Sequence, residues 1–210
     1  MSRRPDLPRR ITPAHLGAAA KAFRKYEGRD SMYRVATFLL REWWGQHEKM
    51  VDALAVLLLT WNGAFYRGAT FKKERLERCL RENWHLIQRF RRRDIRSLGR
   101  ADHPSVEELF LAMLKALERR GGKVARARSP VGTAKALHLL APQFFPIWDS
   151  AIAWQYRCDY TDDPVQAYLR FCGIMQRLVR DLAPRVKQTA EPMLKRIDEY
   201  NYAKYTQGWI

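Results

Sequence analysis

The sequence predicts an all-α, bundle-like domain. Apolar side chains recur at helical spacing in one segment after another, and cap and stop signals stand at the ends of these segments. No segment shows the alternating pattern that is typical of a half-buried strand. With 210 residues, of which 47 % are hydrophobic, the chain is long enough for one large domain or for two small lobes that share a core. We therefore expect a single helical domain over residues 1–210.

Three helices are expected before residue 63. The first is predicted by Thr12-Pro13, a capping residue followed by proline at the first helical position, and is expected to end at Gly28. The second is predicted by four apolar residues that we expect on one face: Val35, Phe38, Leu39 and Trp43. The third runs through the very apolar segment 50–58 to Asn62-Gly63, and its composition predicts the buried centre of the fold.

Two more helices are expected between residues 76 and 122. One is a single amphipathic helix with a basic outer face, predicted by Leu76, Cys79, Leu80, Asn83 and Ile87. The other begins at a capping box formed by Ser105 and Glu108 and is expected to end at Gly121-Gly122. The segment 119–130 is the best candidate for a loop.

The last part of the chain predicts four helical segments. A short helix over 133–140 breaks at Pro142, and the next helix begins at Asp149. Asp163-Pro164 opens a long helix, and a last one is expected over 192–205.

The formal charge of +17 predicts an anionic partner, because such an imbalance costs stability by self-repulsion. Double-stranded DNA is the partner we expect, although RNA or an acidic membrane surface would also satisfy the charge. The three cysteines are widely spaced and form no Cys-x-x-Cys pair, which argues for a reducing compartment. The basic segment 1–10 is followed by no apolar stretch, and no run is long enough to span a bilayer. We expect an intracellular monomer, cytoplasmic and nucleoid-associated, that does not bind a membrane.

The most informative stretch runs from Ser129 to Tyr156. A tight turn at Val131-Gly132 enters the helix that follows, so the backbone N–H groups of Val131, Gly132 and Thr133 are expected to bind a phosphate. Asp149 stands at the start of the next helix. Aspartate is a preferred N-cap, and the residues alone favour that interpretation over a catalytic one.

The same stretch resembles the helix-hairpin-helix superfamily of DNA base-excision glycosylases. The resemblance covers about thirty residues and is carried by Val131-Gly132, by Thr133-Ala134 and by residues 145–149, Phe-Pro-Ile-Trp-Asp. It implies a two-lobed helical fold with a cleft between the lobes and a hairpin-like DNA-binding element over 124–150. It also implies that Asp149 holds the position of the family's essential aspartate. The turn lacks the family's first glycine.

A second segment is similar to the loop with which the family enters the duplex. In residues 57–67, Asn62 matches the polar residue that fills the gap left by the flipped base, and Arg67 follows as a DNA contact. A simple helix end at Asn62-Gly63 is an equal alternative. Lys135 lies one position later than the lysine of the family members that also cleave the strand. It is therefore a candidate nucleophile, although a solvated or phosphate-binding lysine is the favoured interpretation.

Aromatic and basic side chains near these segments complete the candidate site. Four aromatic residues could supply the planar walls that a flipped base needs, and we expect one or two of them in a pocket: Trp61, Tyr66, Trp148 and Trp154. The basic run over 89–96 has few acids near it in the sequence, so we expect Arg92 and Arg93 to contact phosphate. A lone histidine, His138, is expected in the core.

The resemblance implies a DNA glycosylase that releases a damaged or mismatched base after base flipping, with strand cleavage left open. Asp149 would stabilise the positive charge that develops on the sugar. No cofactor and no metal are implied, since the histidines and cysteines lack ligand spacing. The alternatives are a non-catalytic DNA- or RNA-binding helical module and a ribosome-associated factor. A nuclease is disfavoured because no clustered carboxylates could hold magnesium.

Overall fold

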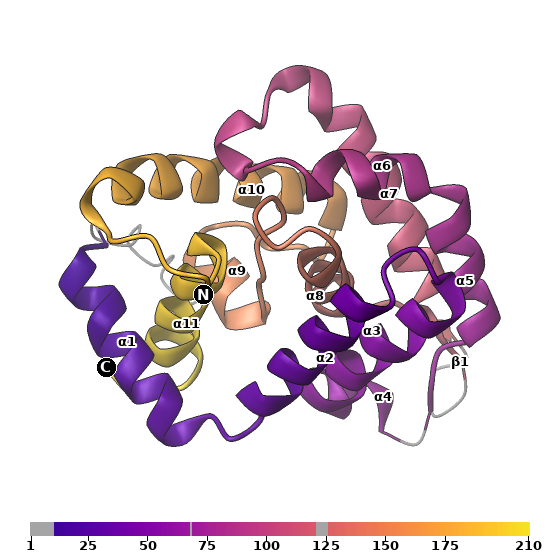
Figure 1. Cartoon of the computed structure of the whole chain (residues 1–210), viewed down its shortest axis with the longest axis horizontal. Coiled ribbons are helices and arrows are strands. Elements are labelled where there is room, and N and C mark those ends of the chain that lie inside the picture. The colour runs from indigo at the N-terminus through magenta and orange to yellow at the C-terminus, as the bar shows by residue number, and fades with distance from the viewer. Residues whose placement is uncertain (1–10, 68, 121–125) are drawn as a thin grey trace.

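The computed structural model describes residues 11–67, 69–120 and 126–210, and these form eleven α-helices (Figure 1). The predicted all-α class is confirmed. In chain order the helices are α1 (Pro13–Tyr26), α2 (Asp30–Glu42), α3 (His47–Trp61), α4 (Gly63–Tyr66), α5 (Lys73–Glu82), α6 (Trp84–Arg91), α7 (His103–Ala116), α8 (Pro130–Leu140), α9 (Ser150–Gln155), α10 (Pro164–Leu182) and α11 (Met193–Asn201). Shorter turns are η1 (Ile95–Ser97), η2 (Arg100–Asp102), η3 (Ala183–Arg185) and a π-helical turn, η4 (Tyr202–Thr206).

The segment predicted as a loop contains two strands of two residues each, β1 (Arg119–Arg120) and β2 (Arg126–Ala127), paired antiparallel. Helix α7 ends at Ala116, before the predicted stop. Three predicted features lie outside the described residues: the basic segment 1–10, the glycine pair at 121–122, and positions 124–125 of the hairpin-like element.

The strongest cap predictions are confirmed. Oγ1 of Thr12 accepts a hydrogen bond from the backbone N–H of His15, and Pro13 opens α1. The carboxylate of Asp163 accepts hydrogen bonds from the first turn of α10. Helix α3 ends at Trp61 with Asn62 as its C-cap, as expected from Asn62-Gly63.

The face of α2 was predicted wrongly. Its buried side chains are Tyr33, Ala36 and Leu40, whereas Val35 and Phe38 are 44 % and 53 % exposed. The helix turns Tyr33 inward because the Tyr33 hydroxyl is hydrogen-bonded to Nε2 of the buried His138 (3.0 Å). A polar anchor thus decides an orientation that an apolar pattern leaves ambiguous.

Three other boundaries also differ from prediction. The single helix expected over residues 76–87 is two helices, because Asn83 ends α5 and its side chain donates to the Cys79 carbonyl (2.9 Å). Helix α7 begins at His103, so the capping box of Ser105 and Glu108 does not form. Helix α8 begins at Pro130 rather than Thr133, because Ser129 caps it.

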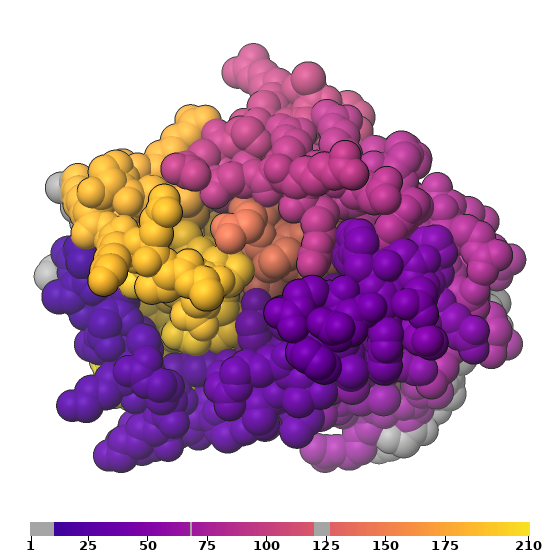
Figure 2. Space-filling model, viewed as in Figure 1, coloured from indigo at the N-terminus to yellow at the C-terminus, as the bar shows by residue number. Residues whose placement is uncertain are grey.

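Two groups of helices meet at the centre of the molecule. Helix α3 packs against α2, α5 and α8, and α7 packs against α5 and α8. The second group joins the ends of the chain, since α1 packs on α11 and on η4, which also contacts α9. In the space-filling view the yellow C-terminal residues lie against the indigo N-terminal helix, and orange residues show only near the centre (Figure 2).

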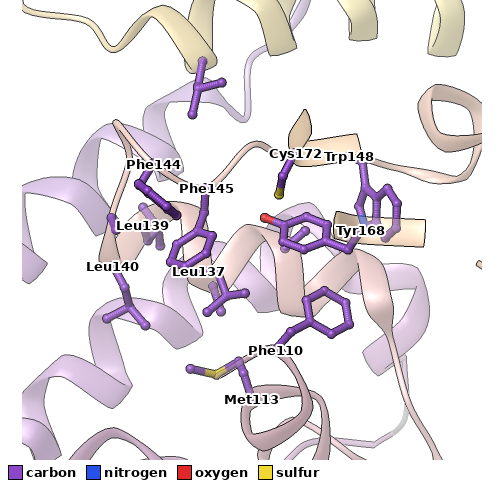
Figure 3. Packing of buried hydrophobic residues seen from close by; sticks show 14 of the residues in the cluster. Phe110, Met113, Leu137, Leu139, Leu140, Phe144, Phe145, Trp148, Tyr168 and Cys172 are labelled. Atoms are coloured by element: carbon purple, nitrogen blue, oxygen red, sulfur yellow. The ribbon is translucent and has the colours of Figure 1, made fainter. Parts of the chain in front are cut away.

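The core between these helices is aromatic and continuous. Trp148, which follows α8, packs on Tyr168 of α10, and Tyr168 packs on Phe110 of α7 (Figure 3). Phe145 packs on Phe144 in the same core. All but the first two residues of α8 are buried. Helix α8 therefore runs through the interior and carries any polar side chain on it into the centre of the protein. No helix in the described part of the chain is long and apolar enough to cross a membrane.

Candidate functional site

A pocket of about 260 Å³ opens where the end of α1, the end of α3, the start of α8 and the start of α9 meet α11. It is small beside the roughly 300–1,000 Å³ of pockets that hold drug-sized ligands, so it suits one compact ring system. Apolar and aromatic walls surround a few converging polar groups. The lining residues are Phe23, Glu27, Arg29, Trp61, Asn62, Val131, Lys135, Ile147, Trp148, Asp149, Ser150, Ile152, Asp198 and Tyr202.

Asp149 caps α9 and also lines this pocket. Its Oδ1 accepts a hydrogen bond from the Ile152 N–H (2.8 Å), as the preferred sequence interpretation predicted. Its Oδ2 accepts from the Thr206 hydroxyl (2.6 Å). The cap and the pocket are therefore compatible, because the capping hydrogen bond from Ile152 and the second one from Thr206 together hold the carboxylate at the pocket wall.

Lys135 points into the protein, so it is not a solvated lysine, and its binding of phosphate stays a prediction. Its side chain reaches the pocket from α8, and the residue is only 8 % exposed. Nζ donates a hydrogen bond to the Trp61 carbonyl (2.6 Å), and no described carboxylate lies within ion-pair distance of it. Burial lowers the pKa of Lys135 to about 8, against the opposing influence of the Asp198 and Asp149 carboxylates. About a tenth of such lysines are neutral at pH 7, against less than about a thousandth in water.

Two charged residues of α11 were missed by sequence reasoning. Asp198 lines the pocket and is 5 % exposed, and burial raises its pKa to about 7. Lys195 is fully buried, with Nζ 2.8 Å from Glu199 and 3.4 Å from Asp30. Both were missed because charged residues on a short amphipathic helix usually lie on its exposed face, and the sequence gives no sign that these two are buried.

Trp61 is held rigidly at the pocket wall. Its ring stacks on Tyr33 at 5.6 Å, and its Nε1 donates to the Arg29 carbonyl (2.8 Å). The Lys195 ammonium lies 5.5 Å from the Trp61 ring and 4.2 Å from that of Phe23. At the rim, the Arg29 guanidinium pairs with Glu27 and donates to the Tyr202 hydroxyl.

Two of the four predicted pocket aromatics line the pocket, Trp61 and Trp148. Trp148 does so from the core, since it is fully buried and donates from Nε1 to the Pro130 carbonyl (3.1 Å). Tyr66 lies elsewhere in the core, where its hydroxyl donates to the Leu117 carbonyl. Trp154 is 45 % exposed and outside the pocket. Phe23 and Tyr202, which supply the remaining aromatic wall, were missed because both belong to segments far from the matched motifs.

The start of α8 was expected to bind phosphate with the backbone N–H groups of Val131, Gly132 and Thr133, but those of Gly132 and Thr133 are already used within the protein. The Gly132 N–H donates to Oγ of Ser129 (3.0 Å), and the Thr133 N–H donates to the Ser129 carbonyl (2.9 Å). Both residues are buried, and the Thr133 hydroxyl donates to the same carbonyl (3.0 Å). Val131 is half-buried and lines the pocket with its side chain. Of the three residues predicted to bind DNA here, Val131 lines the pocket, and Gly132 and Thr133 lie buried behind it.

The basic run on α6 and after it is largely neutralised by acids that follow in the chain. Arg93 and Arg89 both pair with Asp102 (2.6 Å each), and Arg93 is therefore not a free phosphate ligand. Arg91 is used internally, where it donates to the carbonyls of Leu139 and Leu140. Arg92 is exposed, and so is Arg67, and no described residue pairs with either. Of the three arginines expected to contact DNA, Arg67 and Arg92 are therefore the two that are exposed and unpaired.

His138 is a core residue, as expected. Nδ1 faces the Phe145 carbonyl (2.8 Å), which can only accept, so Nδ1 carries the proton and Nε2 accepts from the Tyr33 hydroxyl. Burial lowers the pKa of His138 to about 4. Among the described residues no three histidine, cysteine or acidic side chains are grouped to hold a metal ion.

Comparisons of the chain with protein-family models, with curated proteins and with solved structures found no match.

Proposed function

We propose that this protein is a DNA glycosylase that extrudes one base from duplex DNA and breaks its N-glycosidic bond. The observation that carries the proposal is the convergence of Lys135 and Asp149 in one aromatic-walled pocket. Asp149 matches the family motif in sequence, and Lys135 lies one position later than the family's lysine. Asp149 is the N-cap of α9, and Lys135 comes from the middle of α8. Asn62, the matched wedge residue, lines the same pocket.

The resemblance supplies a finer view of the fold. The two lobes of the family correspond to the group formed by α1, α9, α11 and η4 and to the group built around α3. In this view α7, the turn at Pro130 and α8 make up the helix-hairpin-helix element. The packing of α7 on α8 supports this assignment, although the strand pair β1–β2 makes the connection longer than a simple turn.

The chemistry divides between two side chains. The Asp149 carboxylate stabilises the positive charge that develops on the deoxyribose as the glycosidic bond breaks. The neutral amine of Lys135 attacks C1′ and forms a Schiff base, which commits the enzyme to strand cleavage as well as base release. A glycosylase needs planar walls for the flipped base, and Trp61 and Tyr202 offer them.

The rival is a binding module that holds DNA without chemistry. Such a module has no need for a buried lysine, and an unpaired amine in the interior costs stability. Exposed Arg67 and Arg92 would serve both functions equally. The pocket therefore favours the enzyme.

A panel of duplexes that each carry a different damaged or mismatched base tests the proposal. Base release and strand cleavage are scored separately under single-turnover conditions. We expect release from at least one duplex, followed by cleavage at the same site. Tight binding of the whole panel without any release would favour the binding module.

A further inference from the structure

Three acids line the pocket, Glu27, Asp149 and Asp198, and the proposed chemistry assigns no function to Asp198. It projects from α11 into the space that Lys135 enters from α8. The residue is 5 % exposed, and among the described residues no hydrogen bond or ion pair ends on its carboxylate. Its oxygens are not among the fully enclosed polar atoms that lack a partner, so they face the open space of the pocket, where a bound group can reach them.

The titratable groups that act on Asp198 come from α11, α8, α2 and the start of α9. Asp198 faces Lys195 and Glu199 of α11, Lys135 of α8, Asp149 before α9 and Tyr33 of α2. Lys135 faces Asp198, Asp149, Glu27 and Arg29. Lys195 is already committed to Glu199 and Asp30. Asp149 is committed to the Ile152 N–H and the Thr206 hydroxyl. Glu27 is committed to Arg29, so Asp198 is the pocket acid whose oxygens are uncommitted. It lies beyond the 4.0 Å ion-pair distance from Nζ of Lys135, so a proton passes between them through one bridging water.

We propose that Asp198 carries protons between Lys135 and the sugar oxygen while the Schiff base forms, an inference that rests on the proposed glycosylase function. Lys135 begins as an ammonium with three protons on Nζ. It passes one through the bridging water to the Asp198 carboxylate, and the neutral amine attacks C1′ of the open abasic sugar. The C1′–N bond forms, and the carbonyl electron pair moves onto oxygen, which takes the proton from Asp198.

The second half of the step repeats this transfer. Asp198 takes another proton from nitrogen and gives it to the hydroxyl, which leaves as water as the nitrogen lone pair closes the C=N bond. The Schiff base keeps one proton, the two others leave in the water, and Asp198 ends as it began. Its pKa near 7 suits it to both directions of transfer, since a proton carrier works best when its pKa lies near the working pH.

The test is borohydride trapping on a duplex with a preformed abasic site, which bypasses base release. Wild type, Asp198→Asn and the exposed control Asp181→Asn are compared from about pH 5.5 to about pH 9. We expect Asp198→Asn to trap at least about 100-fold more slowly over the whole range, with DNA affinity and the control rate unchanged.

A merely electrostatic role gives the opposite result. Removing the Asp198 charge lowers the pKa of Lys135 further, which makes more neutral amine at low pH. A trapping rate equal to or above wild type at pH 6 to 7 would therefore overturn the proposal while leaving the glycosylase in place. A wild-type protein that neither traps nor cleaves would overturn both. Asp198→Ala adds a second readout, because we expect formate to restore its rate at least about tenfold.

Discussion

The side-chain amide of Asn62, at the end of α3, donates a hydrogen bond to Oγ of Ser129, the residue that caps α8 (3.1 Å). The same Nδ2 lies 2.9 Å from where a Cβ on Gly132 would stand. Residues 67 positions apart in the chain therefore fix one another at the pocket, and a Cβ on residue 132 would force that amide to move.

This contact gives the first prediction. Asn62→Ala should lower the flipped fraction of a base by about tenfold, or about 1.4 kcal/mol, because nothing then fills the gap in the duplex. Fluorescence of a 2-aminopurine placed at the target site measures the flipped fraction. Gly132→Ala, which displaces the amide without removing it, should show a decrease in the same direction. An unchanged signal in Asn62→Ala, with the fold intact by thermal unfolding, would contradict the wedge role.

The second prediction separates free from paired arginines. DNA affinity should fall steeply as salt rises, because phosphate contacts release counterions. Arg92→Ala should weaken binding and reduce the slope of log affinity against log salt by about one, since Arg92 is exposed. Arg93→Ala is the matched control next to it, and its pairing with Asp102 predicts little change in slope. Equal effects of the two substitutions would show that Arg93 leaves Asp102 to contact DNA.

The third prediction concerns acid stability. His138 is neutral in the fold, and burial lowers its pKa from 6.5 to about 4, so the unfolded chain binds the extra proton between these values. The free energy of unfolding should therefore decrease as the pH falls from about 6.5 to about 4, by up to about 3 kcal/mol from this residue. Urea unfolding of wild type and of His138→Gln over this pH range measures how the free energy of unfolding depends on pH. The variant should lose stability at neutral pH but show a shallower pH dependence, and parallel curves would refute the assignment.

Much of the helical framework could be predicted, because caps and apolar spacing are local signals. Thr12-Pro13, Asp163-Pro164 and the apolar run of α3 each specify a helix without help from distant residues. The face of α2 could not be predicted, because it depends on a hydrogen bond between Tyr33 and His138, 105 residues away.

The candidate site divides in the same way. Asp149 and Lys135 lie in one continuous stretch of sequence, the one that resembles the glycosylases, so both could be predicted as site residues from that stretch alone. Asp198 and Lys195 reach the pocket only because α11 packs on α1, which returns the end of the chain to its start. The ion pair between Arg93 and Asp102 could not be predicted either. It forms because two turns of 3-10 helix between them, η1 and η2, bring Asp102 back to Arg93.

The fourth prediction tests Asp149. Asp149→Asn should lower base release by about 100- to 1,000-fold, because a neutral amide supplies little of the stabilisation that a carboxylate gives to the developing oxocarbenium ion. Asparagine is as good an N-cap as aspartate, so the start of α9 should remain stable. Asp163→Asn is the matched control, a capping aspartate of α10 outside the pocket, and should release base at the wild-type rate. DNA affinity should hold or increase, since a negative charge is removed from the pocket. Full activity of Asp149→Asn would refute the proposed chemistry.

The last prediction concerns Lys135 as the nucleophile. Its amine is buried at the pocket with a pKa near 8, so Schiff-base formation should increase as the pH rises through about 8, when the neutral amine becomes the major form. Borohydride should trap wild-type protein on DNA, and Lys135→Met should abolish both trapping and strand cleavage. Methionine fills a similar apolar volume, and exchanging a buried unpaired amine for it should leave the free energy of unfolding unchanged or higher. Lys135→Arg separates charge from nucleophilicity, because a guanidinium stays protonated and cannot form the Schiff base. If Lys135 acted only through its charge, Lys135→Arg would keep strand cleavage and Lys135→Met would lose it. We expect both variants to be inactive in cleavage, while the exposed Lys21→Ala control retains full trapping.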